Sequence, residues 1–199
     1  MSIRIDRNKV RIAWLLGYAA FALAFLAGCR VATPTGPSSW TREGGTPVAF
    51  TLKSPSVGEG EKIPVDHTCD GANQSPQLKW ADPQPNTASF VLILDDPDAP
   101  GGTFTHWVLF NIPGTQRELP AGFSNGRGLG TAGLNDFSRT VYGGPCPPRG
   151  NAHRYFFTLF ALDTAALQLP DGASRHDIET AMRGHVIGQA QLMGRYQRK

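Results

Sequence analysis

The sequence has little net charge and no run of basic residues, which limits the partners it can have. Of its 199 residues, 19 are basic and 16 are acidic. Four basic residues and one acidic residue lie within positions 1–11, so this short segment accounts for the whole excess of +3. The rest of the chain is neutral, which gives no electrostatic reason to expect binding to DNA or RNA.

The chain also lacks internal repeats, heptads and any apolar run beyond 13 residues. Its 23 glycines and 16 prolines argue against a helical bundle or a coiled coil and favour short strands joined by turns. Removing the residues before Cys29 leaves a chain of the size of one ordinary domain.

The one long apolar run, Trp14–Leu26, follows a basic segment and is too short to cross a bilayer comfortably. These features predict a signal peptide over residues 1–28. The run ends in Leu-Ala-Gly-Cys at positions 26–29, which resembles the lipobox of bacterial lipoproteins, in which the cysteine carries diacylglycerol. The alternatives are an ordinary secretory signal or a short membrane anchor.

A lipid on Cys29 would place the protein in the cell envelope, anchored to a membrane by its acyl chains. If the cell is Gram-negative, Arg30 after the cysteine is compatible with the outer membrane, facing the periplasm. Residues 30–46 are rich in proline, glycine, serine and threonine and predict a flexible tether. The folded domain is then expected over residues 47–199.

Two cysteines, Cys69 and Cys146, remain after Cys29. Disulfides persist in exported proteins, so these two residues either form one bond or are separate buried thiols. The number of cysteines alone does not decide between the two.

Alternation and enrichment in β-branched and aromatic residues predict six strands. One helix is expected over Ser174–His185, where Ser174 and Asp177 have the spacing of a capping box, and a weaker helical turn over Ala165–Leu169. Mostly antiparallel strands with a few helices near the C-terminus indicate a mainly β, sandwich-like α+β domain. The predicted strands are Val48–Lys53, Gln77–Trp80, Phe90–Leu94, Thr105–Ile112, Tyr155–Leu162 and Gln189–Arg195.

Chemically active residues gather at the ends of these strands and in the long loops 54–76 and 113–150. Asp95, Asp96 and Asp98 follow an apolar strand in a proline-rich turn, which could equally be a solvated surface turn. His106 begins the next apolar strand, although a histidine there is often only a core or edge residue. The pair Gly143-Gly144 precedes another apolar strand, and the triplet His153-Arg154-Tyr155 begins that strand. Backbone N–H groups of a Gly-Gly pair and the side chains of histidine and tyrosine can donate hydrogen bonds to an oxyanion.

Four stretches together resemble the phosphatidylethanolamine-binding proteins, which include Raf kinase inhibitor protein, and most closely their bacterial Raf-kinase-inhibitor-like branch. They occur in the order found in that family and span most of residues 48–195. The stretches are His67–Trp80 (HTCDGANQSPQLKW), Phe90–Pro100 (FVLILDDPDAP), His106–Pro113 (HWVLFNIP) and Tyr142–Asp163 (YGGPCPPRGNAHRYFFTLFALD).

The resemblance implies a central antiparallel β-sheet, helices toward the C-terminus and a small pocket for phosphate-like groups. It also favours a Cys69–Cys146 disulfide at the pocket wall. The sequence departs from the family at His67, where bacterial members often have an aromatic residue, and at Phe110 and Phe160, where tyrosine is common. The matching pocket residues are Asp96, Asp98, Pro100, His106, Gly144, Pro148, His153 and Tyr155.

We therefore expect a non-enzymatic protein that binds a small phosphorylated or anionic ligand, without catalytic residues, metal or cofactor. The Gly144 N–H, the Tyr155 hydroxyl and the histidines His106 and His153 would receive the anion, while Asp96 orients an imidazole. Protonation of the histidines should raise the affinity toward acid pH.

Two other functions stay open: a protease inhibitor or protein-interaction module, and a weak hydrolase using histidine and carboxylate as acid and base. The sequence contains neither G-x-S-x-G nor H-E-x-x-H. It does not indicate the oligomeric state or the identity of a protein partner.

Overall fold

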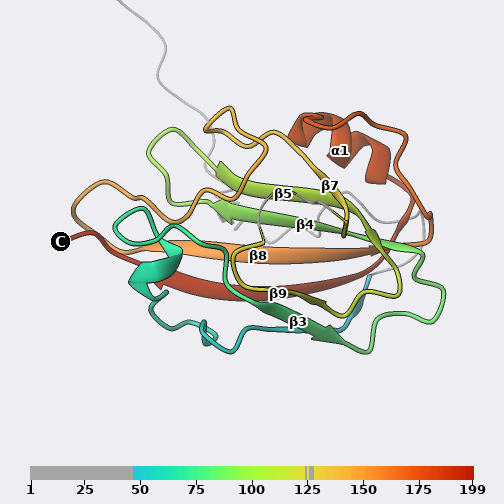
Figure 1. Ribbon diagram of the computed structural model, residues 1–199, viewed down its shortest axis with the longest axis horizontal. Helices are drawn as coiled ribbons and strands as arrows, with labels where there is room; N and C mark the ends of the chain where they lie inside the picture. Colours follow the sequence, from blue (N-terminus) through green and yellow to red (C-terminus); the bar gives the residue numbers. More distant parts are fainter. Residues whose placement is uncertain (1–46, 124, 126–127) are drawn as a thin grey trace, which may run out of the picture. The chain divides into compact units, whose positions relative to one another are not determined.

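The computed structural model describes residues 47–199 except 124, 126 and 127 (Figure 1). The predicted signal peptide, Cys29 and the tether lie outside the described residues. Among the residues that are described, no helix is both long and apolar enough to span a membrane.

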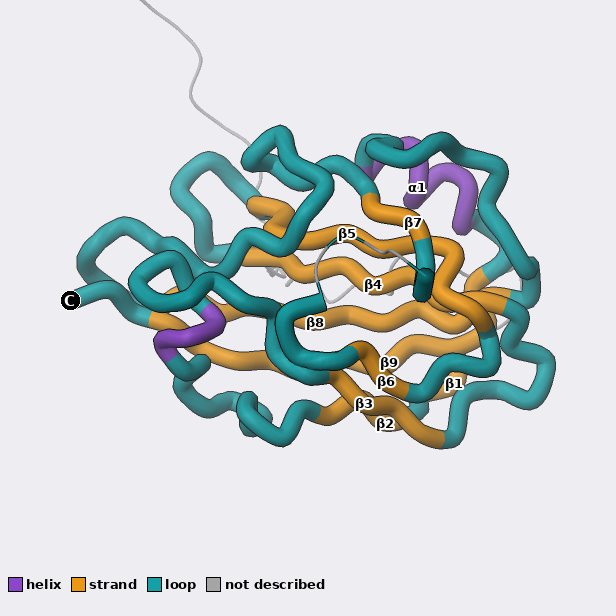
Figure 2. The backbone as a smooth tube through the Cα atoms, in the orientation of Figure 1, coloured by secondary structure: helices purple, strands orange, loops and turns teal. Residues whose placement is uncertain are grey.

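Two β-sheets build the domain (Figures 1 and 2). The larger has six strands in the order β1-β9-β8-β4-β5-β7, and every pair is antiparallel except β1 with β9. Its strands are β1 (Val48–Ala49), β9 (Val186–Tyr196), β8 (His153–Leu162), β4 (Ser89–Asp96), β5 (Phe104–Pro113) and β7 (Thr131–Ala132). The smaller sheet has three antiparallel strands, β2 (Thr51–Lys53), β3 (Leu78–Ala81) and β6 (Glu118–Leu119).

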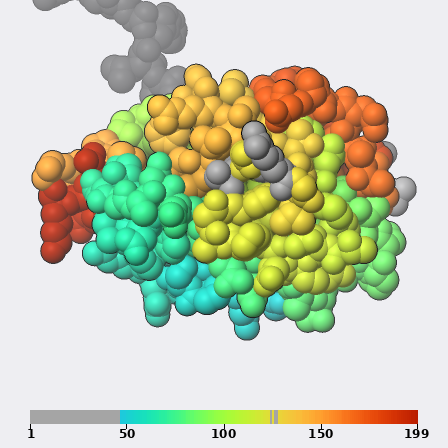
Figure 3. Space-filling view, in the orientation of Figure 1, coloured from blue at the N-terminus to red at the C-terminus, as the bar shows by residue number. Residues whose placement is uncertain are grey.

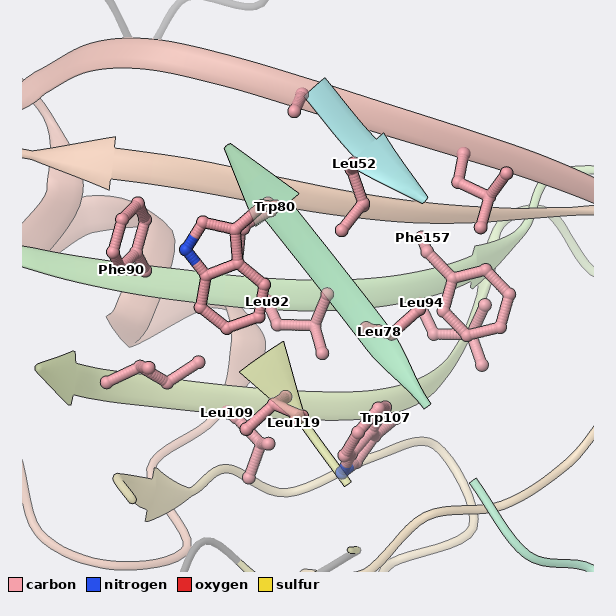
Figure 4. Packing of buried hydrophobic residues seen from close by; sticks show 14 of the residues in the cluster. Leu52, Leu78, Trp80, Phe90, Leu92, Leu94, Trp107, Leu109, Leu119 and Phe157 are labelled. Carbon is pink, nitrogen blue, oxygen red and sulfur yellow. The ribbon is translucent and has the colours of Figure 1, made fainter. Parts of the chain in front are cut away.

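The central strand β4 is buried on both faces of the larger sheet, and its alternate side chains enter two different cores. Phe90 and Leu92 pack with Leu78 and Trp80 of the smaller sheet (Figure 4). Val91 and Ile93 belong to a second core that includes residues of the helix. Burial on both faces explains why β4 is a continuous apolar run in the sequence rather than an alternating one.

The helix α1 (Arg175–Met182) begins as the capping box predicts. The Ser174 hydroxyl accepts a hydrogen bond from the Asp177 N–H at 3.1 Å and donates one to the Asp177 carboxylate at 2.6 Å. Ile178 and Met182 are buried against the larger sheet. The helix ends at Met182, three residues before the predicted end at His185.

The second predicted helical turn, Ala165–Leu169, is wrong. The Asn111 side chain binds the backbone of Leu167 there, accepting from its N–H at 2.7 Å and donating to its carbonyl at 3.1 Å. These bonds replace the ones that a helix would make within its own backbone. A short 3₁₀ helix at Val65–His67 was not anticipated.

All six predicted strands form, although the first is divided. Val48–Lys53 forms two strands on either side of Phe50, because β1 pairs with β9 of the larger sheet and β2 with β3 of the smaller one. The strands β6 and β7 were missed, since two residues are too few to show alternation.

A disulfide joins the two long loops at one end of the larger sheet. Cys69 and Cys146 are bonded at 2.05 Å, and the Cys69 N–H donates to the Pro145 carbonyl at 3.2 Å. The Tyr142 hydroxyl donates to the His67 carbonyl at 2.7 Å, which ties the same two loops together a second time. The Ala99–Pro100 bond is trans, as are the other peptide bonds of the described residues.

Replacing both bonded cysteines, as in Cys69→Ser with Cys146→Ser, is expected to lower the free energy of unfolding by about 4 kcal/mol, because the bond closes a loop with a sequence separation of 77 residues. Urea denaturation followed by circular dichroism measures the change. Reduced wild-type protein should match the double variant, and a loss below about 1 kcal/mol would contradict this role.

Candidate functional site

The proposed site lies where three neighbouring strands of the larger sheet begin or end. β4 ends at Asp96, while β8 begins at His153 and β5 at Phe104, close to His106. Because β4 runs antiparallel to both neighbours, its end lies beside their beginnings. The topology therefore brings together Asp96 and His153, which are 57 positions apart in the chain.

The Asp96 carboxylate organises this end of the sheet. It is 3% exposed, and one of its oxygens accepts a hydrogen bond from His153 Nδ1 at 2.8 Å. Its other oxygen accepts from the Asp98 N–H at 2.9 Å, which fixes the turn after β4. Since a carboxylate only accepts, His153 Nδ1 must carry its hydrogen, and Nε2 is the ring nitrogen left over.

His106 is held in the same manner by backbone carbonyls. Its Nδ1 donates to the carbonyls of Gly143 at 2.9 Å and Gly144 at 3.2 Å, so its Nε2 is also the ring nitrogen left over. The imidazole is buried, and its ring centre lies 5.3 Å from those of both Phe137 and Tyr155. Burial lowers the pKa of His106, and the carbonyl bonds and the Asp96 charge act against that decrease.

Tyr155 completes this group of side chains. The residue is fully buried, and its hydroxyl makes no hydrogen bond of normal geometry within the described part of the chain. Burial raises the pKa of Tyr155, and the Asp96 carboxylate raises it further, so the phenol keeps its proton at physiological pH. Buried hydroxyls almost always have partners, and the groups near this one are the Asp96 carboxylate and the Cys146 backbone, which act on the pKa of Tyr155 in opposite directions.

Asp98 makes its main contacts with Arg154 rather than with an imidazole. Its carboxylate accepts from Arg154 Nη2 at 2.7 Å, from Nε at 2.9 Å and from the Arg154 backbone N–H at 2.9 Å. The Arg154 hydrogen bonds hold the pKa of Asp98 at about 2. The predicted residues Pro100 and Pro148 are both exposed, in the loops on either side of the group.

The expectation that the Gly144 N–H is available to an anion is wrong. That N–H donates to Asn73 Oδ1 at 2.7 Å, and the Gly143 N–H donates to the His106 carbonyl at 3.1 Å. Gly144 is required instead by close packing, because a Cβ there would lie 2.4 Å from the His67 carbonyl oxygen. Gly144 therefore contributes its carbonyl, which helps to fix His106.

Two asparagines support the site and were missed from the sequence. Asn73 holds Gly144, and its positive φ of 53° suits a residue type that tolerates this conformation. Asn135 donates to the carbonyls of His106 at 3.0 Å and Val141 at 2.8 Å, and its own Oδ1 accepts from Phe137 and Arg139 N–H groups. No local pattern in the sequence indicates such long-range partners.

A cavity of about 180 Å³ lies next to the histidine site, on the side of the disulfide. Its lining includes Phe137, Tyr142, Gly143 and Gly144 together with both cysteines. In the described residues, no three histidine, cysteine or acidic side chains are grouped so that they could hold a metal ion.

Comparison with known proteins identifies the class. Residues 53–197 match the family model of the phosphatidylethanolamine-binding proteins, and the chain belongs to this family. The crystal structure of Escherichia coli YbcL, described as a member of the mammalian phosphatidylethanolamine-binding protein family, superposes with a TM-score of 0.71 at 31% identity. That match covers 75% of this chain and 99% of YbcL.

Two sequence relatives extend the comparison. A UPF0098 protein of Aquifex aeolicus is 52% identical over 148 residues, which is 73% of this chain and 86% of the relative. A Mycobacterium tuberculosis protein named "Putative lipoprotein LppC" is 37% identical over 200 residues. That match covers 92% of this chain and 95% of the relative, so it reaches beyond the folded domain.

If Gly144 serves packing, Gly144→Ala should lower the free energy of unfolding by about 2–3 kcal/mol, because the new methyl group meets backbone atoms that cannot withdraw. Gly101→Ala is the matched control, since a Cβ at Gly101 would have no neighbour within 4 Å. Thermal or urea unfolding measures both. Equal stability of the two variants would show that the space at Gly144 is not restricted.

Proposed function

We propose that this protein binds a small phosphate-like or other anionic group at His106, His153 and Tyr155, and does so without catalysing a reaction. The observation that carries the proposal is the buried hydroxyl of Tyr155, which lies near the Asp96 carboxylate and the Cys146 backbone without making a hydrogen bond of normal geometry to either. The Tyr155 ring lies 5.3 Å from that of His106, and the Asp96 carboxylate near its hydroxyl accepts from His153 Nδ1. The Nδ1 atoms of both imidazoles are already bonded. A ligand oxygen placed there would satisfy the hydroxyl and meet the two Nε2 atoms.

The charge of the site depends on its histidines. With both imidazoles neutral, Asp96 gives the group a charge of −1, and Nε2 of each ring is an acceptor that repels an anion. Protonating both rings changes the group to +1 and turns each Nε2–H into a donor. Asp98 adds little to this balance because Arg154 neutralises it. Anion binding is therefore coupled to proton uptake.

The side chains at the site favour binding over catalysis. Cys146, the cysteine closest in sequence to these side chains, is bonded to Cys69 in the disulfide and has no free thiol that could act as a nucleophile. The raised pKa of Tyr155 keeps its hydroxyl protonated, which makes it a hydrogen-bond donor and a poor nucleophile. Asp96 is engaged by His153 and by the turn that follows β4.

We further propose that the protein is a lipoprotein anchored through Cys29. The Leu-Ala-Gly-Cys sequence at positions 26–29 supports this, as does the similarity to LppC, which includes the N-terminal region. The anchor would place the domain in the cell envelope. In a Gram-negative cell, Arg30 would be compatible with the outer membrane and a site facing the periplasm.

The variant Tyr155→Phe tests the observation on which the proposal rests, the buried hydroxyl of Tyr155. We expect it to weaken binding of inorganic phosphate and O-phosphoethanolamine about tenfold, equivalent to one hydrogen bond to a charged group, while stability is kept. The measurement is an NMR titration of residues 30–199, a fragment that contains the whole domain. The matched chain in the YbcL crystal consists almost entirely of such a domain.

Tyr142→Phe is the matched control, because it removes a buried hydroxyl that donates to His67 outside the proposed site. It should lower stability by about 1 kcal/mol and leave binding unchanged. Absence of phosphate-induced shifts in the wild type at both pH 5.5 and pH 7.5 would overturn the proposed function. Release of phosphate from O-phosphoethanolamine would instead identify a hydrolase.

The affinity for sulfate should rise at least fivefold between about pH 8 and pH 5.5, because His106 has a lowered pKa and must take up a proton to donate from Nε2. Sulfate is the suitable probe, since its own charge is constant over this range. Calorimetry at several pH values, in buffers with different ionisation enthalpies, also measures the proton uptake. A flat profile would mean that neutral imidazoles suffice.

A further inference from the structure

The Cys69–Cys146 disulfide lies within reach of other molecules. Cys69 is an exposed residue and Cys146 is half-buried, and both line the cavity of about 180 Å³ beside the histidine site. In Figure 3, the segment around position 70 lies at the surface beside the segment around positions 140–145. A disulfide opens when a thiolate attacks one of its sulfurs, and access helps to decide which sulfur is attacked. The exposure of Cys69 makes its sulfur the one that a thiolate meets first.

One end of this disulfide belongs to the segment that holds the proposed anion site. The Gly144 carbonyl, two residues before Cys146, accepts from His106 Nδ1 at 3.2 Å, and the Gly143 carbonyl accepts from the same nitrogen at 2.9 Å. The Cys146 backbone lies near the Tyr155 hydroxyl. This segment therefore contacts two of the three side chains that would receive the anion.

Hydrogen bonds accompany the disulfide between the same two loops. The Cys69 N–H donates to the Pro145 carbonyl at 3.2 Å, and the Gly144 N–H donates to Asn73 Oδ1 at 2.7 Å. Each of these hydrogen bonds can be exchanged for one to water, whereas the covalent bond cannot. Opening the disulfide should therefore loosen the segment that ends in Cys146, while the strands of the larger sheet keep their own pairing.

Loosening this segment would act on the charge of His106. Burial lowers the pKa of His106, and the Gly143 and Gly144 carbonyls and the charges of Asp96 and Asp136 oppose that decrease. Displacing the carbonyls removes part of this opposition while the ring stays buried, so the pKa falls further. Fewer rings are then protonated at a given pH, and fewer Nε2 atoms can donate to an anion.

We propose that the Cys69–Cys146 disulfide is a site of thiol–disulfide exchange with a protein dithiol, and that opening it weakens anion binding at His106, His153 and Tyr155. This rests on the proposed function. In the exchange, one thiolate of the dithiol attacks Sγ of Cys69, and Cys146 leaves as a thiolate. The second thiol of the dithiol then displaces Cys69, so the partner is oxidised to a disulfide and its two protons end on Cys69 and Cys146.

The first test is an NMR titration of residues 30–199 with inorganic phosphate, before and after reduction with excess dithiothreitol. We expect the reduced domain to bind phosphate at least about fivefold more weakly, because the acceptors of His106 are no longer held in place. The imidazole resonances should report a lower pKa for His106, and reoxidation should restore the affinity. The variant Cys69→Ser with Cys146→Ser should bind like the reduced domain.

The second test identifies the sulfur that is attacked. Brief exposure of the oxidised domain to glutathione, followed by iodoacetamide and peptide mass spectrometry, should find glutathione on Cys69 and the iodoacetamide label on Cys146. Glutathione on Cys146 instead would overturn the assignment of Cys69 as the point of attack.

Met182→Ala is the matched control for a general loss of stability. It leaves a cavity in the core that contains α1, whose buried members include no residue of the loops 54–76 and 113–150. Its oxidised form should bind phosphate as tightly as the wild type.

Equal affinity of the oxidised and reduced wild-type domains would overturn the inference. Unfolding of the domain on reduction would overturn it too, since the effect would then not be confined to the site. Failure of the oxidised domain to bind phosphate would instead overturn the proposed function, so the two failures are distinguishable.

Discussion

The buried carboxylate of Asp96 is the contact on which the candidate site depends. Burying a charged group is costly unless it is hydrogen-bonded, and here both oxygens have donors, one from a histidine and one from the next turn. The same carboxylate thereby fixes the orientation of His153, the start of the turn that carries Asp98, and the electrostatic setting of Tyr155 and His106. Loss of this single charge would free His153 and the turn after β4, and it would change the charge around Tyr155 and His106.

Asp95, the residue before Asp96, shows how the larger sheet separates two environments. Asp95 points to the other side of β4, where Arg175 of α1 and Thr105 bind it at 2.8 and 3.0 Å. Burial raises its pKa to about 6 despite the favourable charge of Arg175. Two adjacent carboxylates therefore serve different ends: Asp95 attaches the helix to the sheet, while Asp96 organises the site.

Much of the fold and part of the candidate site could be predicted from the sequence. Strands such as β4 and β8 were predictable because apolar side chains must be buried over a long segment, and the cap at Ser174 because its hydrogen bonds are local. His106 and His153 were noticeable as histidines at the starts of apolar strands, and the resemblance to a family assigned both to one pocket. The occupation of the Gly144 N–H by Asn73 and the support from Asn135 could not be predicted, since each depends on contacts between distant loops.

The entry of the chain into the domain has a mechanical consequence. β1 is only two residues long and pairs in parallel with β9 at the edge of the larger sheet, whereas β2, just after it, belongs to the other sheet. A pull on the N-terminal side would therefore load β1 first, and the shear would fall on very few backbone hydrogen bonds. Detaching β1 lengthens the connection to any anchor before the strands β4, β5 and β8, which carry the site, experience the force. The edge strand would act as a weak link that protects the site's geometry.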